Sequence, residues 1–164
     1  EPSKLISELG ATLRSERFRG ALGMSKLNQP ILAVVEVMSG PMDGMEIKIR
    51  KPVTNIGRME RVGLCLDCGY KFPGGFECPN CRSSKIRTEE NDIILHLDRF
   101  TSRIHAHITF EDGRFWLEDR GSTNGTWLVR GESVERVTER KILGDEDTFL
   151  IGQTYLRLKT KNLT

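Results

Sequence analysis

Four cysteines in the middle of this 164-residue chain have the spacing of a metal site. They form two Cys-x-x-Cys pairs, separated by nine residues: Cys65 with Cys68, and Cys78 with Cys81. Two such pairs let four thiolates converge tetrahedrally on one Zn²⁺ ion. Gly69 follows the first pair directly and suits a turn in which backbone N–H groups face a sulfur. We therefore expect one structural zinc ion.

Other uses of the four cysteines stay open at this point. Disulfides are one alternative, and a redox dithiol is another, although a redox pair usually opens a helix beside a strand and no such pattern is visible. Iron in a rubredoxin-like site is a third, because it accepts the same four thiolates. Zinc is favoured, since the segment Gly63–Arg82 has few aliphatic residues and needs a metal to be ordered. The segment resembles a zinc ribbon.

Three short runs hold residue types that recognise a phosphate group: Ile56-Gly57-Arg58, Ser102-Arg103-Ile104-His105 and Gly121-Ser122-Thr123-Asn124-Gly125-Thr126. Each is expected at a strand end or in a loop, where binding groups collect. A phosphothreonine carries nearly two negative charges and three strong acceptors, and reading it takes guanidinium, hydroxyl and backbone donors. Taken singly, each run has a plainer interpretation as a surface arginine, a turn serine or an Asn-Gly hairpin turn.

Together, in this order and spacing, the three runs resemble the signature of the forkhead-associated (FHA) family. Three further stretches agree with it: Asn91–Leu95, Phe115–Asp119, and Leu143–Asp145 before Phe149–Gly152. The resemblance covers about Ile31 to Lys159, apart from an insertion. It implies an all-β, FHA-type β-sandwich that binds phosphothreonine peptides.

The resemblance also implies roles for the matching residues. Arg58 corresponds to the arginine that contacts phosphate, where a planar fork outperforms lysine. Ser102 corresponds to the hydroxyl donor, and Arg103 to a second cationic contact. Thr123 corresponds to a contact on the pocket wall, and Asn124 to the side chain that holds the peptide backbone beyond the phosphothreonine.

Three more residues of these runs are expected to support the site. Gly57 and Gly125 let the backbone turn tightly. His105 is expected to brace the loops through hydrogen bonds. The other two histidines, His96 and His107, are interpreted as ordinary strand residues, since cysteines already supply the metal ligands.

The elements that must position these residues are short strands separated by turns, which predicts a β-sandwich. Asp112-Gly113 is a good hairpin turn between two of them. The expected strands are Ile31–Met38, Met45–Ile49, Val53–Arg58, Ile93–His96, Ala106–Phe110, Phe115–Glu118, Thr126–Val129, Lys141–Leu143, Thr148–Ile151 and Tyr155–Leu158.

Three parts of the chain are distinguished on this basis. Residues 1–30 are expected to form a short amphipathic helix and a linker, because Leu5, Leu9 and Leu13 recur every four residues. Residues 31–160 form the expected FHA sandwich. Residues 59–90 form the zinc-ribbon insertion within it, where most FHA domains have only a short loop.

The insertion has three possible roles: it touches the ligand, it presents a second partner site, or it stiffens the loop. The stiffening role is slightly favoured, since a metal clip on a long loop lowers chain entropy. A Gly-Ser loop in place of residues 60–89 is then expected to leave a folded domain that binds a minimal phosphothreonine peptide. The aromatic and hydrophobic residues Leu64, Tyr70, Phe72 and Phe76 cannot all be buried in so small a unit, so some are expected to form an exposed patch that contacts the partner. The shortened chain is expected to bind its full-length partner less tightly, because the avidity from this patch is lost.

We interpret the chain as a signalling or regulatory adaptor that binds a Thr-phosphorylated protein downstream of a Ser/Thr kinase. The pairing of FHA with a cysteine knuckle resembles archaeal motility regulators, which implies a von Willebrand type A partner. The alternative is a zinc-ribbon nucleic-acid-binding regulator with an FHA control domain. Lys and Arg total 25 against 23 Asp and Glu, so the basic surplus of a nucleic-acid binder is missing.

An enzyme is not expected, because no nucleophile–base–acid set or catalytic motif matches. No apolar run reaches the roughly 18–20 residues of a membrane span, and no signal peptide is visible. Reduced, paired cysteines fit a cytoplasmic location.

Overall fold

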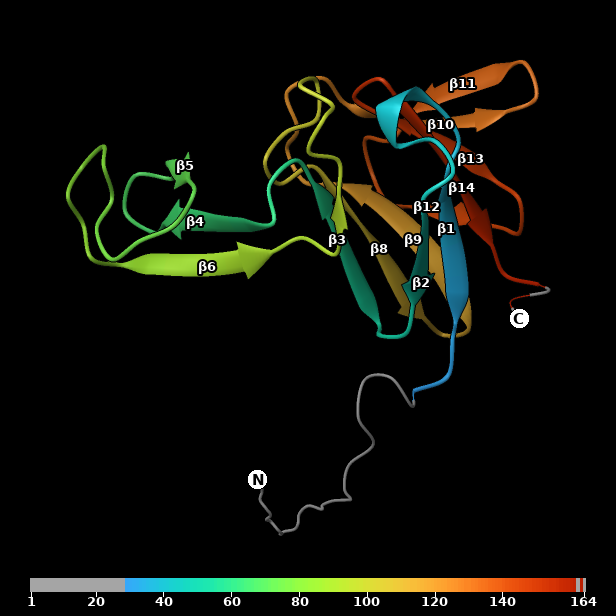
Figure 1. The fold of residues 1–164 in the computed structure, drawn as a ribbon, viewed down its shortest axis with the longest axis horizontal. Helices are drawn as coiled ribbons and strands as arrows, with labels where there is room; N and C mark the ends of the chain where they lie inside the picture. The colour runs from blue at the N-terminus through green and yellow to red at the C-terminus, as the bar shows by residue number, and fades with distance from the viewer. Residues whose placement is uncertain (1–28, 162, 164) are drawn as a thin grey trace, which may run out of the picture. The chain divides into compact units, whose positions relative to one another are not determined.

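The computed structural model describes residues 29–161 and residue 163, and from Leu32 onward the chain forms one structural unit. The short helix expected before Gly20 lies outside the described residues. Among those residues, no helix has the length and apolar character that a membrane span requires. The described part of the chain forms strands in three sheets and one short 3-10 helix, Gly40–Met42 (Figure 1). The expected all-β sandwich is confirmed.

One face of the sandwich is a six-stranded antiparallel sheet in the order β11-β10-β13-β14-β1-β2. Strand β14 shows why these residues form a half-buried sheet, because Leu156 and Leu158 are buried, while Tyr155 before them is exposed and Arg157 between them is half-buried. The strands of this sheet are β1 (Ala33–Val37), β2 (Glu46–Ile49), β10 (Thr126–Arg130), β11 (Ser133–Arg136), β13 (Thr148–Ile151) and β14 (Thr154–Lys159).

The second face is a five-stranded sheet in the order β12-β9-β8-β3-β7. Strands β8 and β9 form the expected hairpin, and its turn residues Asp112 and Gly113 both have positive φ, 54° and 74°. Only the pair β3–β7 is parallel, which is possible because the insertion lies between them. The strands are β3 (Val53–Gly57), β7 (Ile93–Ile94), β8 (Ala106–Glu111), β9 (Arg114–Asp119) and β12 (Lys141–Leu143).

The hydrophobic core lies between these two sheets. The six-stranded sheet contributes Phe149 and Leu156, and the five-stranded sheet contributes Ile56, Ile108 and Leu117, all of them essentially inaccessible to solvent. Burying an aliphatic or phenylalanine side chain of this kind contributes about 1.5–3 kcal/mol. The sandwich is therefore stabilised by its own apolar residues, and its loops have a firm base.

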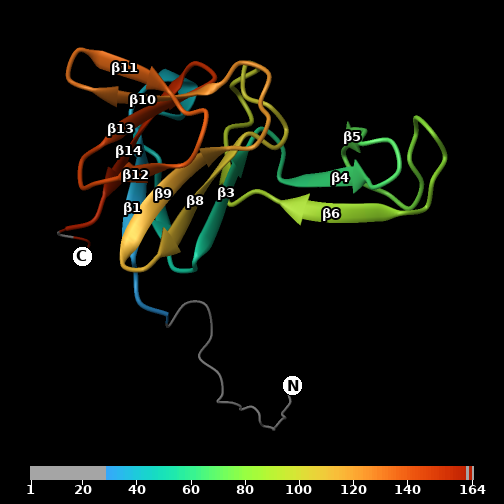
Figure 2. The same ribbon diagram turned by 180° about the vertical axis from the view of Figure 1, so that it is seen from behind.

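The insertion folds as a separate three-stranded sheet, in the order β5-β4-β6. Its strands are β4 (Arg61–Cys65), β5 (Lys71–Phe72) and β6 (Ile86–Glu90), and we call residues 61–90 the zinc hairpin. It leaves the sandwich after β3 and returns just before β7 (Figures 1 and 2). The loops that follow β7 and β9 lie at this same end of β3, opposite the β8–β9 turn.

The structure differs from the expected strands in three places. Strand β11 was not expected, because all four of its residues are exposed and show no alternation. The strands of the insertion were not expected either. His96 lies in the loop after β7 rather than in a strand, because the parallel pairing of β7 with β3 covers only Ile93 and Ile94. His107 is in strand β8, where its Nε2 lies 2.9 Å from Glu118.

Candidate phosphate-binding pocket and four-cysteine site

One pocket of about 270 Å³ brings together all five residues that the sequence assigned to phosphopeptide binding. They come from the end of β3, the loop after β7 and the loop after β9. Four of the lining residues carry cationic side chains, and none of the described residues that line the pocket is acidic, so it favours an anion. The lining residues are Arg58, Lys71, Arg99, Phe100, Thr101, Ser102, Arg103, Gly121, Thr123 and Asn124.

Gly57 lets two segments approach closely enough to form this pocket. A Cβ atom at this position would lie 2.1 Å from the Arg103 carbonyl oxygen and 2.4 Å from Asn91 Nδ2, both far inside van der Waals contact. The next backbone N–H, of Arg58, donates to the Ser102 carbonyl at 3.0 Å. The Arg58 guanidinium donates to the Arg99 carbonyl at 3.3 Å. Arg58 and Ser102 are thus held side by side through their backbones.

Asn91 closes the same junction from the other side. Its Nδ2 donates to the Met59 carbonyl at 2.6 Å and to the Arg103 carbonyl at 2.7 Å. The side chain is buried and joins the base of the zinc hairpin to the loop after β7. Sequence reasoning gave Asn91 no role, although a polar residue at the entrance of a buried strand was a usable signal.

The Ser102 hydroxyl is positioned between two loops. Its Oγ accepts a hydrogen bond from the Thr123 backbone N–H at 3.0 Å. A hydroxyl that accepts in this way still has its own hydrogen to donate to a ligand. The Ser102 backbone N–H donates to His105 Nδ1 at 3.0 Å.

His105 is fully buried and bridges the two loops. Its Nδ1 accepts from Ser102, and its Nε2 lies 2.9 Å from the Gly125 carbonyl oxygen, which can only accept. The ring is therefore neutral with its hydrogen on Nε2. Burial lowers the pKa of His105, although the Gly125 carbonyl opposes the shift. A neutral imidazole acts here as a brace rather than as an acid or a base.

The loop after β9 is organised by Asp119. Its carboxylate accepts from the Ser122 backbone N–H at 2.8 Å, the Ser122 hydroxyl at 2.6 Å and the Thr126 hydroxyl at 2.8 Å. Burial raises the pKa of Asp119, but these hydrogen bonds outweigh it and leave the pKa below its usual range. Gly125 completes the turn with a φ of +86°. The sequence did not single out Asp119 as the residue that shapes this loop.

Thr123 and Asn124 stand at the exposed tip of that loop. The Asn124 side-chain amide donates to the Phe100 carbonyl at 2.9 Å, which ties the tip to the loop after β7. Arg103 points differently, because its Nη1 donates to the Lys71 carbonyl of the zinc hairpin at 2.9 Å. Its Nε is buried and has no hydrogen-bond partner among the residues that the structure describes. Lys71 and Arg99 line the pocket and were missed by sequence reasoning.

Comparison with known families agrees with this geometry. The FHA domain model matches residues 82–152, which contain two of the three signature runs. The sandwich has the fold of an FHA domain. The matched span begins inside the zinc hairpin and leaves out Arg58, because the hairpin separates β3 from the rest of the domain.

Several solved FHA structures share the fold. The FHA domain of the CT664 protein from Chlamydia trachomatis is 20% identical, with a TM-score of 0.52, over 77% of this chain and 95% of its own. Mycobacterium tuberculosis EmbR, in complex with a low-affinity phosphopeptide, is 19% identical, with a TM-score of 0.56, over 94% of this chain and 29% of its own.

A third structure comes from a study of phosphothreonine-dependent FHA domain interactions. It is 19% identical, with a TM-score of 0.51, over 80% of this chain and 98% of its own. No curated protein matches the chain.

Outside the FHA pocket, the four cysteines gather at the far end of the zinc hairpin. Their sulfur atoms all lie within 4.8 Å of one another. Cys65 and Cys81 Sγ are 3.5 Å apart, and Cys68 and Cys78 Sγ are 3.6 Å apart. Four thiolates at about 2.3 Å from a tetrahedral zinc ion would be separated by about 3.8 Å. The donor set and its spacing therefore fit a metal ion.

Backbone N–H groups surround these sulfurs as expected for Cys-x-x-Cys turns. Cys68 N–H donates to Cys65 Sγ at 3.4 Å, and the Asn80 and Cys81 N–H groups donate to Cys78 Sγ at 3.3 and 3.5 Å. The Asn80 side-chain amide donates to Cys68 Sγ and lowers the pKa of that thiol to about 6.

The Cys81 thiol behaves oppositely. The Ser83 backbone N–H lowers its pKa, but interactions with the neighbouring thiols, above all Cys65, and burial outweigh this and raise the pKa to about 12. Thiolates this close repel each other. A cation among them would remove that repulsion, so the site is suited to a divalent metal ion.

Proposed function

We propose that this chain is a phosphothreonine-dependent protein–protein interaction module that acts as a signalling or regulatory adaptor. The observation that carries the proposal is the cationic FHA pocket that gathers Arg58, Ser102, Arg103, Thr123 and Asn124. The activity proposed is binding, not catalysis. Its partner is a protein phosphorylated on threonine by a Ser/Thr kinase.

Each residue has a role that its contacts support. Arg58 presents a guanidinium to the phosphate, and the Ser102 hydroxyl donates to a phosphate oxygen. Asn124, at the exposed loop tip, exchanges its bond to the Phe100 carbonyl for the backbone of the bound peptide. Thr123 and Arg103 complete the pocket wall. Gly57, His105 and Gly125 keep the loops in place without touching the ligand.

The four cysteines are proposed to hold one structural zinc ion. Support comes from the four thiol ligands, the sulfur separations of 3.5 and 3.6 Å, and the N–H groups that donate to Cys65 and Cys78. A zinc ion supplies folding free energy to a unit too small for its own core. It leaves no coordination position open for chemistry.

The partner is proposed from the relatives and from the resemblance to archaeal motility regulators. The relative from Mycobacterium tuberculosis was solved with a phosphopeptide. By resemblance, a von Willebrand type A protein phosphorylated on threonine is the candidate partner. A nucleic-acid ligand is not favoured, because basic residues of the zinc hairpin pair with acidic ones, as in Arg61–Glu90 and Arg87–Glu89.

A degenerate phosphothreonine peptide library gives the best-binding sequence, and calorimetry with that peptide tests the proposal. The phosphorylated peptide should bind, the plain peptide should not, and phosphoserine should bind more weakly, as the family resemblance implies. Arg58→Ala should weaken binding about tenfold or more, because a hydrogen bond to a charged group contributes about 1.5–3 kcal/mol.

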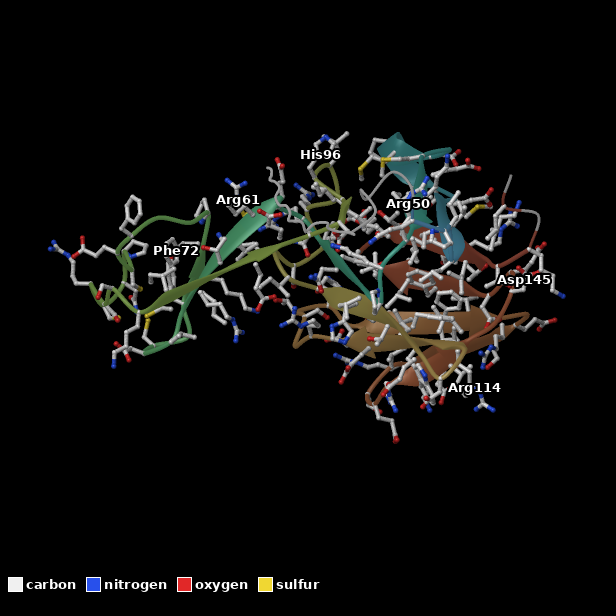
Figure 3. The ribbon with its side chains drawn as sticks, turned by 90° about the horizontal axis from the view of Figure 1, so that it is seen from below. Arg50, Arg61, Phe72, His96, Arg114 and Asp145 are labelled. Carbon is white, nitrogen blue, oxygen red and sulfur yellow. The ribbon has the colours of Figure 1, made fainter. Side chains whose placement is uncertain are left out.

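Arg114→Ala is the matched control, since Arg114 is exposed beside the β8–β9 turn, away from the zinc hairpin (Figure 3). It should leave affinity unchanged. Equal affinity for phosphorylated and plain peptide would contradict the proposed function. Unchanged affinity in folded Arg58→Ala would contradict the role of that arginine.

A further inference from the structure

The zinc hairpin contacts both loops of the phosphate pocket. From β5, the Lys71 carbonyl accepts from Arg103 Nη1 at 2.9 Å, which fixes the loop after β7. From β6, Glu89 accepts from Arg120 at 2.7 and 3.3 Å. Arg120 directly precedes the loop that carries Thr123 and Asn124. The insertion is thus more than a clip on a remote loop.

Lys71 also lines the pocket itself. Its side chain is half-buried, and no ion-pair partner is found for it among the residues that the structure describes. Arg58, Arg99 and Arg103 line the same pocket, and no carboxylate faces the four cations there. Such a cluster repels itself until an anion with more than one negative charge enters it.

Lys71 lies directly after the turn that joins two of the four cysteines. Strand β4 ends at Cys65, and β5 begins at Lys71, so the turn between the two strands starts directly after Cys65 and contains Cys68. The Cys65 N–H donates to the Tyr70 carbonyl at 3.0 Å, and Leu64 pairs with Lys71. A metal ion bound by these cysteines would fix the turn, and with it the register that places Lys71.

Apolar packing inside the hairpin is too limited to fix the position of Lys71 by itself. Phe72 lies over β4, where a Cβ at Gly63 would come within 2.9 Å of its ring, and it is 4% exposed. Beyond Phe72 the same segment exposes Phe76 almost completely, at 97%. The position of Lys71 therefore depends on the cysteine turn.

We propose that Lys71 of the zinc hairpin is a phosphate-binding residue of the FHA pocket, and that metal binding at the four cysteines sets the affinity for the phosphothreonine ligand. This inference rests on the proposed function. It goes beyond the resemblance, because the cation comes from the insertion. A Gly-Ser loop in place of residues 60–89 removes Lys71 and both loop contacts, so it should weaken binding even of a minimal peptide.

The test measures fluorescence anisotropy of the best phosphothreonine peptide from the degenerate library, with zinc-loaded full chain. Lys71→Gln should weaken binding about fivefold and reduce the salt dependence of the affinity, and Lys71→Arg should restore much of it. Lys85→Gln is the matched control, because Lys85 is an exposed lysine of the same hairpin that does not line the pocket. It should leave the affinity unchanged.

A metal arm completes the design. Removing zinc from the wild-type protein with a chelator should weaken peptide binding at least as much as the Lys71→Gln substitution does. Removing zinc from the Lys71→Gln variant should weaken its peptide binding much less. Three outcomes would overturn this inference but not the proposed function. They are equal affinity of wild type and Lys71→Gln, equal loss of affinity in Lys71→Gln and Lys85→Gln, and an affinity that does not depend on metal. No phosphate-dependent binding by wild type contradicts the proposed function and the inference together.

Discussion

The sandwich and the zinc hairpin are stabilised in different ways. In the sandwich, two sheets bury a continuous apolar core that includes Phe149, Leu156 and Leu117. The hairpin buries few apolar side chains, Val62 and Phe72 among them. Its other compact feature is the group of four cysteine sulfurs. The fold of the sandwich is therefore expected to be independent of metal, whereas the pocket wall formed by the zinc hairpin is expected to depend on bound metal.

Cysteine replacement should separate the two regions most strongly. Cys78→Ser removes a buried cysteine of the proposed zinc site, so the bound zinc should fall from about one ion per chain to a small fraction. The amides of β4, β5 and β6 should lose protection from hydrogen exchange, while those of β8 and β9 keep it. Mass-resolved hydrogen exchange and elemental analysis measure both.

Ser84→Ala is the control for that experiment, since Ser84 is an exposed hairpin residue that is not a metal ligand. It should change neither zinc content nor protection. A fully protected hairpin without metal in Cys78→Ser would show that packing suffices. Loss of protection throughout the sandwich would show that the two regions fold as one.

Gly57→Ala should have the next largest effect, and it acts on the sandwich side of the pocket. The added Cβ would overlap the Arg103 carbonyl and Asn91, so the loop after β7 has to move. We expect a loss of about 3 kcal/mol in the free energy of unfolding and a marked loss of phosphopeptide affinity. Urea denaturation measures the first.

Gly144→Ala provides the comparison for this substitution. A Cβ there would make only an ordinary contact with Asp147, at 3.6 Å. Its unfolding free energy should change little. Similar losses in the two variants would mean that glycine flexibility, and not the close approach at Gly57, is what matters.

The smallest expected effect concerns the ion pair that joins hairpin and sandwich. Arg120 lowers the pKa of Glu89, although burial opposes the shift. A lowered folded pKa means that the pair stabilises the protein above the unfolded pKa of about 4.3, and that this contribution is lost as pH falls further. Glu89→Gln should cost about 1 kcal/mol at neutral pH, and its difference from wild type should vanish in acid.

The neighbouring Glu90→Gln is the control, because Glu90 pairs with Arg61 at 3.4 Å with both side chains largely exposed. It should have no measurable effect. If both substitutions behave alike in urea denaturation across pH, the Glu89–Arg120 pair does not tether the hairpin.

Much of this organisation could be predicted from local sequence. The alternation of apolar residues marked most sandwich strands, the cysteine spacing marked the cluster, and the three signature runs marked residues that meet in one pocket. Strand β11 was not predicted, because its four exposed residues show no alternation of buried and exposed positions. It is a strand only through its pairing with β10.

The part that could not be predicted depends on contacts between distant segments. Lys71 comes close to Arg103 from 32 positions away. Nothing in the residues around Lys71 signals a phosphate pocket, because its role is created by the fold of the hairpin. Asn91 likewise acts on segments that only the folded chain brings near it.

A titration of isotope-labelled, zinc-loaded protein with the phosphothreonine peptide, followed by nuclear magnetic resonance, tests the central claim most directly. The amides of Arg58, Ser102 and Asn124 and the side-chain signals of Lys71 should shift together, with one common dissociation constant. The plain peptide should shift none of them. Shifts confined to the exposed tip of the zinc hairpin around Phe76, or identical shifts with both peptides, would contradict the account.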